Sequence, residues 1–86
     1  MFEVRITTEA GKDLDSLPMG MRARVQHVIE RLAHWPQVSG EKALRGTLKG
    51  AYRVRTGDWW VLFRVDKTAG RVTVFRIANR RDVYDE

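Results

Sequence analysis

The spacing of apolar residues changes once along this sequence, and that change constrains the fold more than any other feature. Between Met21 and Trp35 the apolar residues recur mostly three or four positions apart, with charged residues opposite, as on an amphipathic helix. Pro36 follows and is expected to end that helix. From residue 51 the spacing changes: residues 51–56 alternate between apolar and polar, and residues 59–65 form a long apolar run expected to be a central strand. The chain is therefore predicted to combine a helical first half with a sheet-forming second half.

Shorter patterns place the remaining elements. Residues 2–6 alternate like a strand, and the segment 7–9 offers a cap for a helix over about residues 8–17 that Pro18 ends. A second helix begins near Met19. Residues 36–50 are rich in glycine and are predicted to form a loop with a short turn at 42–44. The strands of the second half are expected at residues 51–56, 59–65 and 71–77.

This order of elements, β-α-α-β-β-β, predicts an α+β fold. The two helices are joined so tightly that they should form an antiparallel hairpin. The hairpin is expected to pack on one face of a roughly four-stranded, mainly antiparallel sheet. Neither a repeat nor a low-complexity segment nor a linker interrupts the sequence, so residues 1–86 are expected to form a single domain.

Composition excludes several classes of protein. Because the sequence has no cysteine, it holds neither a disulfide framework nor a thiolate metal site. The first residues are too charged for a signal peptide, and no apolar run approaches the roughly 18–20 residues of a membrane helix. A cytoplasmic protein with no membrane contact is therefore expected. His27 and His34 lie on one side of the predicted second helix without a third ligand, so neither a metal nor another cofactor is predicted.

The positive charge of the chain is concentrated in its second half. The formal net charge is +5. Residues 1–43 carry six basic and six acidic residues, whereas residues 44–86 carry ten basic and five acidic ones. A one-sided positive field attracts polyanions, which here means nucleic acid or an acidic protein segment. A charge that serves only solubility remains the alternative interpretation.

Arginine is the residue type left to carry chemistry. Arg53 and Arg55 share one face of a predicted strand, about 7 Å apart. Arg80 and Arg81 follow the last strand, and Tyr84 comes soon after. Guanidinium groups bind phosphate oxygens bidentately and stay charged at any working pH. They could therefore clamp an RNA backbone, or stabilise the phosphorane formed when a ribose 2′-hydroxyl attacks the adjacent phosphate. Tyr84 could orient that hydroxyl, act as a base or stack on a nucleobase.

Further side chains are expected to bind RNA beside these arginines. Arg45 and Lys49 lead into the strand of the arginine pair, and with Arg81 they are predicted backbone-binding residues. Consecutive strand residues point to opposite faces. By this parity Trp59 joins the more apolar set and packs against the helices, while Trp60 faces the basic side. There Trp60 could stack on a nucleobase, pack beneath a partner helix or simply fill the face.

Several segments together resemble the RelE/ParE toxin superfamily. In the second half they are Leu48-Lys49-Gly50, Tyr52-Arg53-Val54-Arg55, Gly57-Asp58, Val61-Leu62-Phe63-Arg64-Val65-Asp66 and Arg80-Arg81-Asp82-Val83-Tyr84. The first half agrees through an opening strand, Leu17-Pro18 and a long second helix that ends at Pro36. The resemblance covers nearly the whole chain in order and spacing, and it implies the RelE/ParE-like fold.

This resemblance implies the toxin of a type II toxin–antitoxin system. RelE-like members are ribosome-dependent endoribonucleases that cut mRNA without a metal, and their functional positions fall here on Arg53 and Arg55, on Arg80 or Arg81, and on Tyr84. The implied partners are a small, acidic, partly disordered cognate antitoxin and mRNA on the ribosome. A higher-order toxin–antitoxin complex on operator DNA is implied as well.

Two positions depart from the family pattern. Trp60 stands where relatives commonly have arginine, and Asn79 stands where many have histidine. Asparagine cannot act as an acid or base near neutral pH. Two alternatives to the endoribonuclease therefore stay open. One is a ParE-like, non-enzymatic inhibitor of DNA gyrase, and the other is a catalytically weakened toxin that mainly binds its antitoxin.

Overall fold

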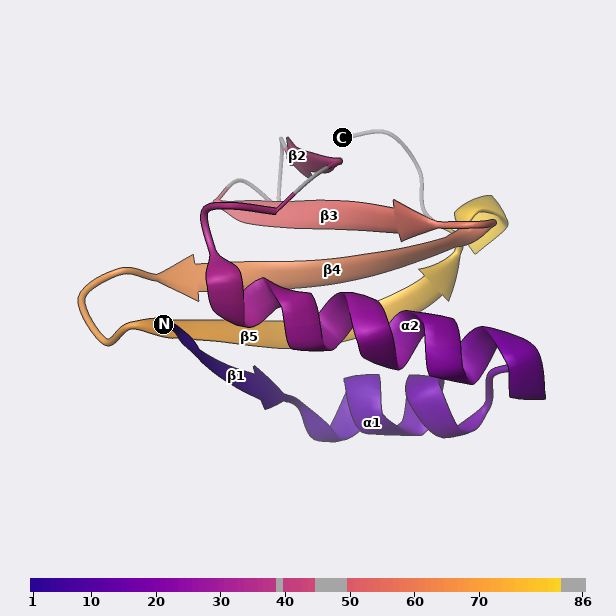
Figure 1. Ribbon diagram of the computed structural model, residues 1–86. Helices are drawn as coiled ribbons and strands as arrows, with labels where there is room; N and C mark the ends of the chain where they lie inside the picture. Colours follow the sequence, from indigo (N-terminus) through magenta and orange to yellow (C-terminus); the bar gives the residue numbers. More distant parts are fainter. Residues whose placement is uncertain (39, 45–49, 83–86) are drawn as a thin grey trace.

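Two helices cover one face of a five-stranded sheet, and the described part of the chain leaves the other face open (Figure 1). The computed structural model describes residues 1–38, 40–44 and 50–82. Its elements are β1 (Glu3–Ile6), α1 (Thr8–Asp15), α2 (Met19–Arg31), the 3₁₀ turn η1 (Leu32–His34), β2 (Glu41–Ala43), β3 (Ala51–Thr56), β4 (Trp59–Asp66), β5 (Arg71–Asn79) and the 3₁₀ turn η3 (Arg80–Asp82). None of the helices in the described ranges is long and apolar enough to cross a bilayer.

The helices follow the local signals of the sequence. Thr7 is the N-cap of α1, because its Oγ1 accepts a hydrogen bond from Ala10 N at 3.2 Å. Pro18 immediately precedes α2, and α2 continues into η1 before the chain reaches Pro36. The two helices run antiparallel, as the short connection at Pro18 predicts (Figure 1).

The sheet has one strand more than the sequence predicts. Its order is β1-β5-β4-β3-β2, with β1 parallel to β5 and the other pairs antiparallel. The additional strand is β2, which lies in the segment predicted to be a loop with a turn. Its three residues are too few to show an alternating pattern, and they form a strand by pairing with β3, where Lys42 lies opposite Arg53. Tertiary pairing, and not local propensity, therefore creates this edge strand.

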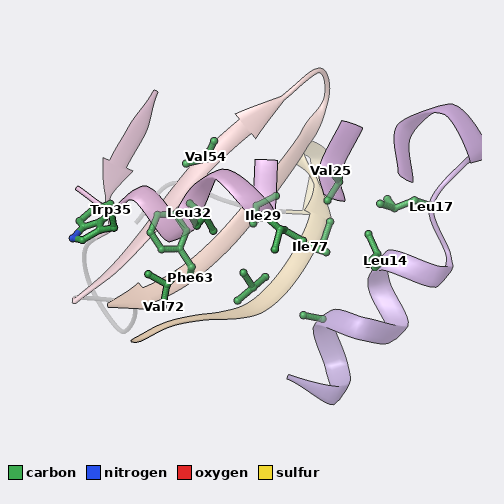
Figure 2. Packing of buried hydrophobic residues seen from close by; sticks show 13 residues of the cluster. Leu14, Leu17, Val25, Ile29, Leu32, Trp35, Val54, Phe63, Val72 and Ile77 are labelled. Atoms are coloured by element: carbon green, nitrogen blue, oxygen red, sulfur yellow. The ribbon is translucent and has the colours of Figure 1, made fainter. Parts of the chain in front are cut away.

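The main core lies between the helices and the sheet (Figure 2). Phe63 lies on the central strand β4 and is fully buried in this core. Its ring lies 5.6 Å from that of Trp35 and 5.8 Å from that of Tyr52, measured between centroids. Trp59 packs against this same cluster while Trp60 does not, so the predicted parity of the two tryptophans is confirmed.

A β-bulge in β5 changes which of its side chains face the helices. Val72 and Val74 are fully buried in the helix-side core. Along β4 the partner then changes from Val74 directly to Arg76, so Phe75 is left without an opposite residue. Beyond the bulge the alternation is reversed: Ile77 enters the helix-side core, and Arg76 is exposed on the open face.

Helix α1 supplies the hydrogen bonds that the β5 backbone lacks beyond the end of β1. Strand β1 pairs only with the first part of β5. Farther along, Thr7 Oγ1 donates to Phe75 O at 3.4 Å, and Ile77 N donates to Asp13 Oδ2 at 2.9 Å. The two bonds flank Arg76, so α1 and its N-cap Thr7 fix the backbone from the bulge residue Phe75 to Ile77.

We expect Asp13→Ala to lower the free energy of unfolding by about 1–3 kcal/mol, because it leaves the part-buried Ile77 amide without its acceptor. The loss should appear despite the higher helix propensity of alanine. Chemical denaturation of the purified protein measures it. The matched control is Asp15→Ala on the same helix, where only an exposed ion pair with Arg22 is lost. Equal destabilisation by the two variants would contradict the assigned role of Asp13.

Candidate functional site

The open face of the sheet has an apolar floor surrounded by arginines. Leu44, Ala51 and Leu62 are buried there, and the half-buried Trp60 and Phe75 pack against them. This second cluster is separate from the helix-side core. On the same face, strand parity places Arg5 of β1, Arg53 and Arg55 of β3, Arg64 of β4, and Arg71 and Arg76 of β5.

Arg53 and Trp60 are in direct contact on this face. The guanidinium carbon of Arg53 lies 4.2 Å from the centroid of the Trp60 ring, which is a cation–π geometry. Both side chains are half-buried. The prediction that Trp60 faces the basic side is therefore confirmed, and Arg53 covers part of its ring.

Arg55 lies at the end of β3, beside the turn to β4. Its side chain is exposed, and its Nε donates to the carbonyl oxygen of Gly57 at 2.8 Å. Gly57 has a φ of +60°, a left-handed conformation that glycine adopts without strain. This tight turn brings the Gly57 carbonyl oxygen within hydrogen-bonding distance of the Arg55 side chain at the end of β3.

Arg80 contacts the same turn from the other side. Arg80 N donates to Asp58 O at 2.8 Å, and Arg80 Nε lies 4.0 Å from Asp58 Oδ1. Arg55 and Arg80 therefore bind adjacent residues of one turn, although they come from distant parts of the sequence. The structure thus brings Arg55 and Arg80 together at this turn, and Arg53 lies two positions before Arg55 on the same face of β3.

Asn79 shapes the 3₁₀ turn that carries Arg80 and Arg81. Its Oδ1 accepts a hydrogen bond from Arg81 N at 3.0 Å. Asn79 thus has a backbone-binding role in this turn. Arg81 is exposed. The remaining predicted site residues, Arg45, Lys49 and Tyr84, lie outside the described residues.

A groove borders the site along the end of β3. Its volume is about 250 Å³, and its lining residues are Val28, Arg31, Val38, Val54, Arg55 and Thr56. Arg55 therefore stands between the groove and the open face.

Two of the described carboxylates, those of Glu3 and Asp66, lie on the open face at the end away from the Gly57-Asp58 turn. Glu3 accepts from Arg71 Nε and from Arg5 Nε, each at 3.0 Å, and these hydrogen bonds, the one from Arg71 first, lower the pKa of Glu3 below its usual value. Asp66 Oδ1 accepts from Ala69 N at 3.0 Å in the β4–β5 turn. At the opposite end, Asp58 contacts Arg80.

Arg64 and Arg76 were not among the candidate residues predicted from sequence. The signal for Arg76 is present in the sequence: after Val72 and Val74 the next large aliphatic residue is Ile77, one position late, which is the mark of a bulge. The signal for Arg64 is its parity with Trp60 and Leu62.

The histidines take no part in this site. His27 and His34 are exposed on α2 and η1, which lie on the opposite side of the sheet. Within residues 1–38, 40–44 and 50–82, no three His, Cys, Asp or Glu side chains gather in a way that could hold a metal ion.

The chain is similar to proteins of a known family. Residues 4–84 match a family described as the ParE toxin of type II toxin–antitoxin system, parDE. The chain is 34% identical over 84 residues to the toxin RelG of Mycobacterium tuberculosis, covering 96% of this chain and 95% of RelG. It is 36% identical over 84 residues to the toxin RelE of that organism, covering 96% of this chain and 86% of RelE. A chain of the toxin–antitoxin complex RelBE2 from Mycobacterium tuberculosis has the same fold, with a TM-score of 0.81 and 32% identity over 92% of this chain and 98% of that chain.

Proposed function

The chain belongs to the ParE toxin family of type II toxin–antitoxin systems, and from this premise we propose that it cleaves ribosome-bound mRNA as a metal-independent endoribonuclease. The observation that carries the proposal is the convergence of Arg55 and Arg80 on the Gly57-Asp58 turn, beside Arg53. Three guanidinium groups from two distant segments there border an exposed face with an apolar floor. Such an arrangement suits a phosphate flanked by nucleobases.

The reaction requires charge stabilisation more than it requires a nucleophile from the protein. The ribose 2′-oxygen attacks the adjacent phosphorus, loses its proton to a base, and forms a 2′,3′-cyclic phosphate while the 5′-oxygen leaves and takes up a proton. The negative charge grows on the phosphoryl oxygens in the transition state. Arg55 and Arg80 stabilise that charge, and Arg53 holds the phosphate in place. Tyr84 orients the 2′-hydroxyl or takes its proton.

The other predicted residues bind the RNA around the reacting phosphate. Arg45, Lys49 and Arg81 bind its backbone. Trp60 carries Arg53 on part of its ring, so it positions that guanidinium and leaves the rest of the indole for stacking on a base. Asn79 fixes the turn on which Arg80 stands and transfers no proton.

The proposed partners follow from the family. A cognate antitoxin is supported by the similarity to a chain of the RelBE2 toxin–antitoxin complex. We expect a small, acidic, partly disordered chain that folds on binding and covers the basic face. Messenger RNA on the ribosome is the proposed substrate, and a higher-order complex on operator DNA is the proposed regulatory form.

A second candidate function is inhibition of DNA gyrase without chemistry. Two observations favour it: the matched family is described as the ParE toxin, and Trp60 and Asn79 replace side chains that relatives use for phosphate stabilisation and proton transfer. A third possibility is a toxin that has lost most of its activity and chiefly binds its antitoxin.

Induced expression in a bacterial host tests the proposed function, with transcriptome-wide mapping of RNA 5′ ends. The comparison is between the natural sequence and the double variant Arg53→Ala, Arg55→Ala. We expect growth arrest with new cuts inside translated mRNAs, both absent in the double variant. Growth arrest with intact mRNA and an SOS response would instead support gyrase inhibition. Normal growth combined with tight antitoxin binding would indicate a weakened toxin.

A further inference from the structure

The bulge in β5 places one arginine where simple alternation would not. Continued alternation from Val72 and Val74 would put residue 76 in the helix-side core. The bulge reverses the parity, so Arg76 lies opposite Leu62 on the open face and is exposed there. The hydrogen bonds from Thr7 and Asp13 to the backbone on either side of Arg76 hold this arrangement. The bulge, held by these hydrogen bonds, is therefore the reason that Arg76 lies on the open face.

Arg64 stands near Arg76 on the neighbouring strand. The register puts Arg64 two positions beyond Leu62, the partner of Arg76, so the two Cα atoms are diagonal neighbours at roughly 7–8 Å. The guanidinium carbon of Arg64 lies 5.1 Å from the centroid of the Phe75 ring, the residue added by the bulge. Leu62, fully buried on the same face, lies directly between Arg76 and Arg53, whereas Arg64 is a diagonal neighbour of both. Arg64 and Arg76 form what we call the distal arginine pair.

The described carboxylates of the open face do not neutralise the distal arginine pair. Glu3 is bonded to Arg5 and Arg71, and Asp66 to the backbone of its own turn. Asp58 lies at the other end of the sheet, with Arg80. The positive potential of the pair is therefore directed to solvent, beside the apolar surface of Phe75.

We propose that the distal arginine pair is a second phosphate-binding subsite, which holds the RNA backbone away from the reacting phosphate. This inference rests on the proposed function for the identity of its ligand as RNA. The RNA chain would cross the sheet from the Gly57-Asp58 turn over Leu62 toward Phe75. One of its phosphates would lie near Arg53 and Arg55, and another near Arg64 and Arg76. Arg64 and Arg76 are thus binding residues for the substrate and do not touch the reacting atoms.

Binding of an uncleavable RNA tests the subsite without relying on catalysis. The probe is a fluorescent single-stranded oligonucleotide whose riboses are all 2′-O-methylated, titrated with purified toxin over a range of salt concentrations. Each lost phosphate contact should make the slope of log affinity against log salt shallower by roughly 0.7. We expect this change in Arg64→Gln and in Arg76→Gln. The matched control is Arg22→Gln, which removes an exposed guanidinium from the helix side and should leave the slope unchanged.

Cleavage kinetics on mRNA-programmed ribosomes separate this inference from the proposed function. In Arg76→Gln we expect a higher half-saturating toxin concentration, with the rate at saturation little changed. Equal salt slopes in the three variants, or no binding of the probe by the natural sequence, would overturn the subsite. Altered slopes in the two distal variants together with no cleavage by the natural sequence would support the subsite and refute the endoribonuclease. Melting curves show whether each variant is folded.

Discussion

Replacing Arg55 with alanine is expected to slow single-turnover cleavage of ribosome-bound mRNA by roughly 10²–10³-fold, the usual effect of removing one group that stabilises transition-state charge. Arg55 is exposed, and its Nε is held by the Gly57 carbonyl oxygen at 2.8 Å. The guanidinium is therefore oriented before RNA binds, and no reorganisation is needed as charge develops on the phosphate. The rate is measured with saturating purified toxin on ribosomes programmed with a defined mRNA.

The matched control for this variant is Arg31→Ala. Arg31 is an exposed arginine that lines the same groove as Arg55 but belongs to α2, on the helix side of the sheet. Its removal changes the net charge equally and should leave the cleavage rate nearly unchanged. If both variants slow cleavage to the same extent, general electrostatic attraction explains the loss, and Arg55 has no specific catalytic role. Unchanged cleavage in Arg55→Ala would remove it from the site.

Replacing Phe63 with alanine is expected to lower the free energy of unfolding by about 3–5 kcal/mol. Phe63 is fully buried on the central strand and contacts the rings of Trp35 and Tyr52. Truncation removes both ring contacts and leaves a cavity that strands on either side cannot easily close. Since small domains are stabilised by only about 5–15 kcal/mol in total, the variant should be close to unfolded at physiological temperature. Urea denaturation of the free toxin measures the change.

Phe75→Ala serves as the comparison for Phe63→Ala. Phe75 is a half-buried phenylalanine on the open face, where it packs in the small second cluster and lies under Arg64. Its removal exposes less apolar surface and leaves no closed cavity, so the loss should be clearly smaller. A similar loss in both variants would mean that the open-face cluster contributes to stability as much as the main core does.

Local periodicity determined both helices, every strand of the sheet except β2, and the faces of β3 and β4. The helical spacing from Met21 to Trp35 and the alternation after residue 51 each depend only on near neighbours in sequence. The opposite directions of Trp59 and Trp60 follow from the same alternation. The arginine-rich second half could likewise be recognised as a candidate site, because strand parity places Arg53 and Arg55 on one face.

Long-range contacts determined the rest. Strand β2 forms because it pairs with β3, and a segment of three residues is too short for an alternating pattern to predict that pairing. The bulge in β5 depends on the helix-side core, which takes Ile77, and on α1, where Asp13 binds the freed amide. Arg76 reaches the open face only for this reason.

The sequence by itself therefore determined the order of the elements other than β2, most of the helix-side core and the presence of a basic face on the sheet. Each of these follows from spacing between near neighbours in a helix or strand. Only the tertiary structure decided which arginines meet. Arg55 and Arg80 come together because the β3–β4 turn accepts one hydrogen bond from the Arg55 side chain, at the end of β3, and another from the Arg80 backbone, after β5. Such contacts join residues far apart in sequence, and their geometry is fixed by strand register and backbone bonding after the core has formed.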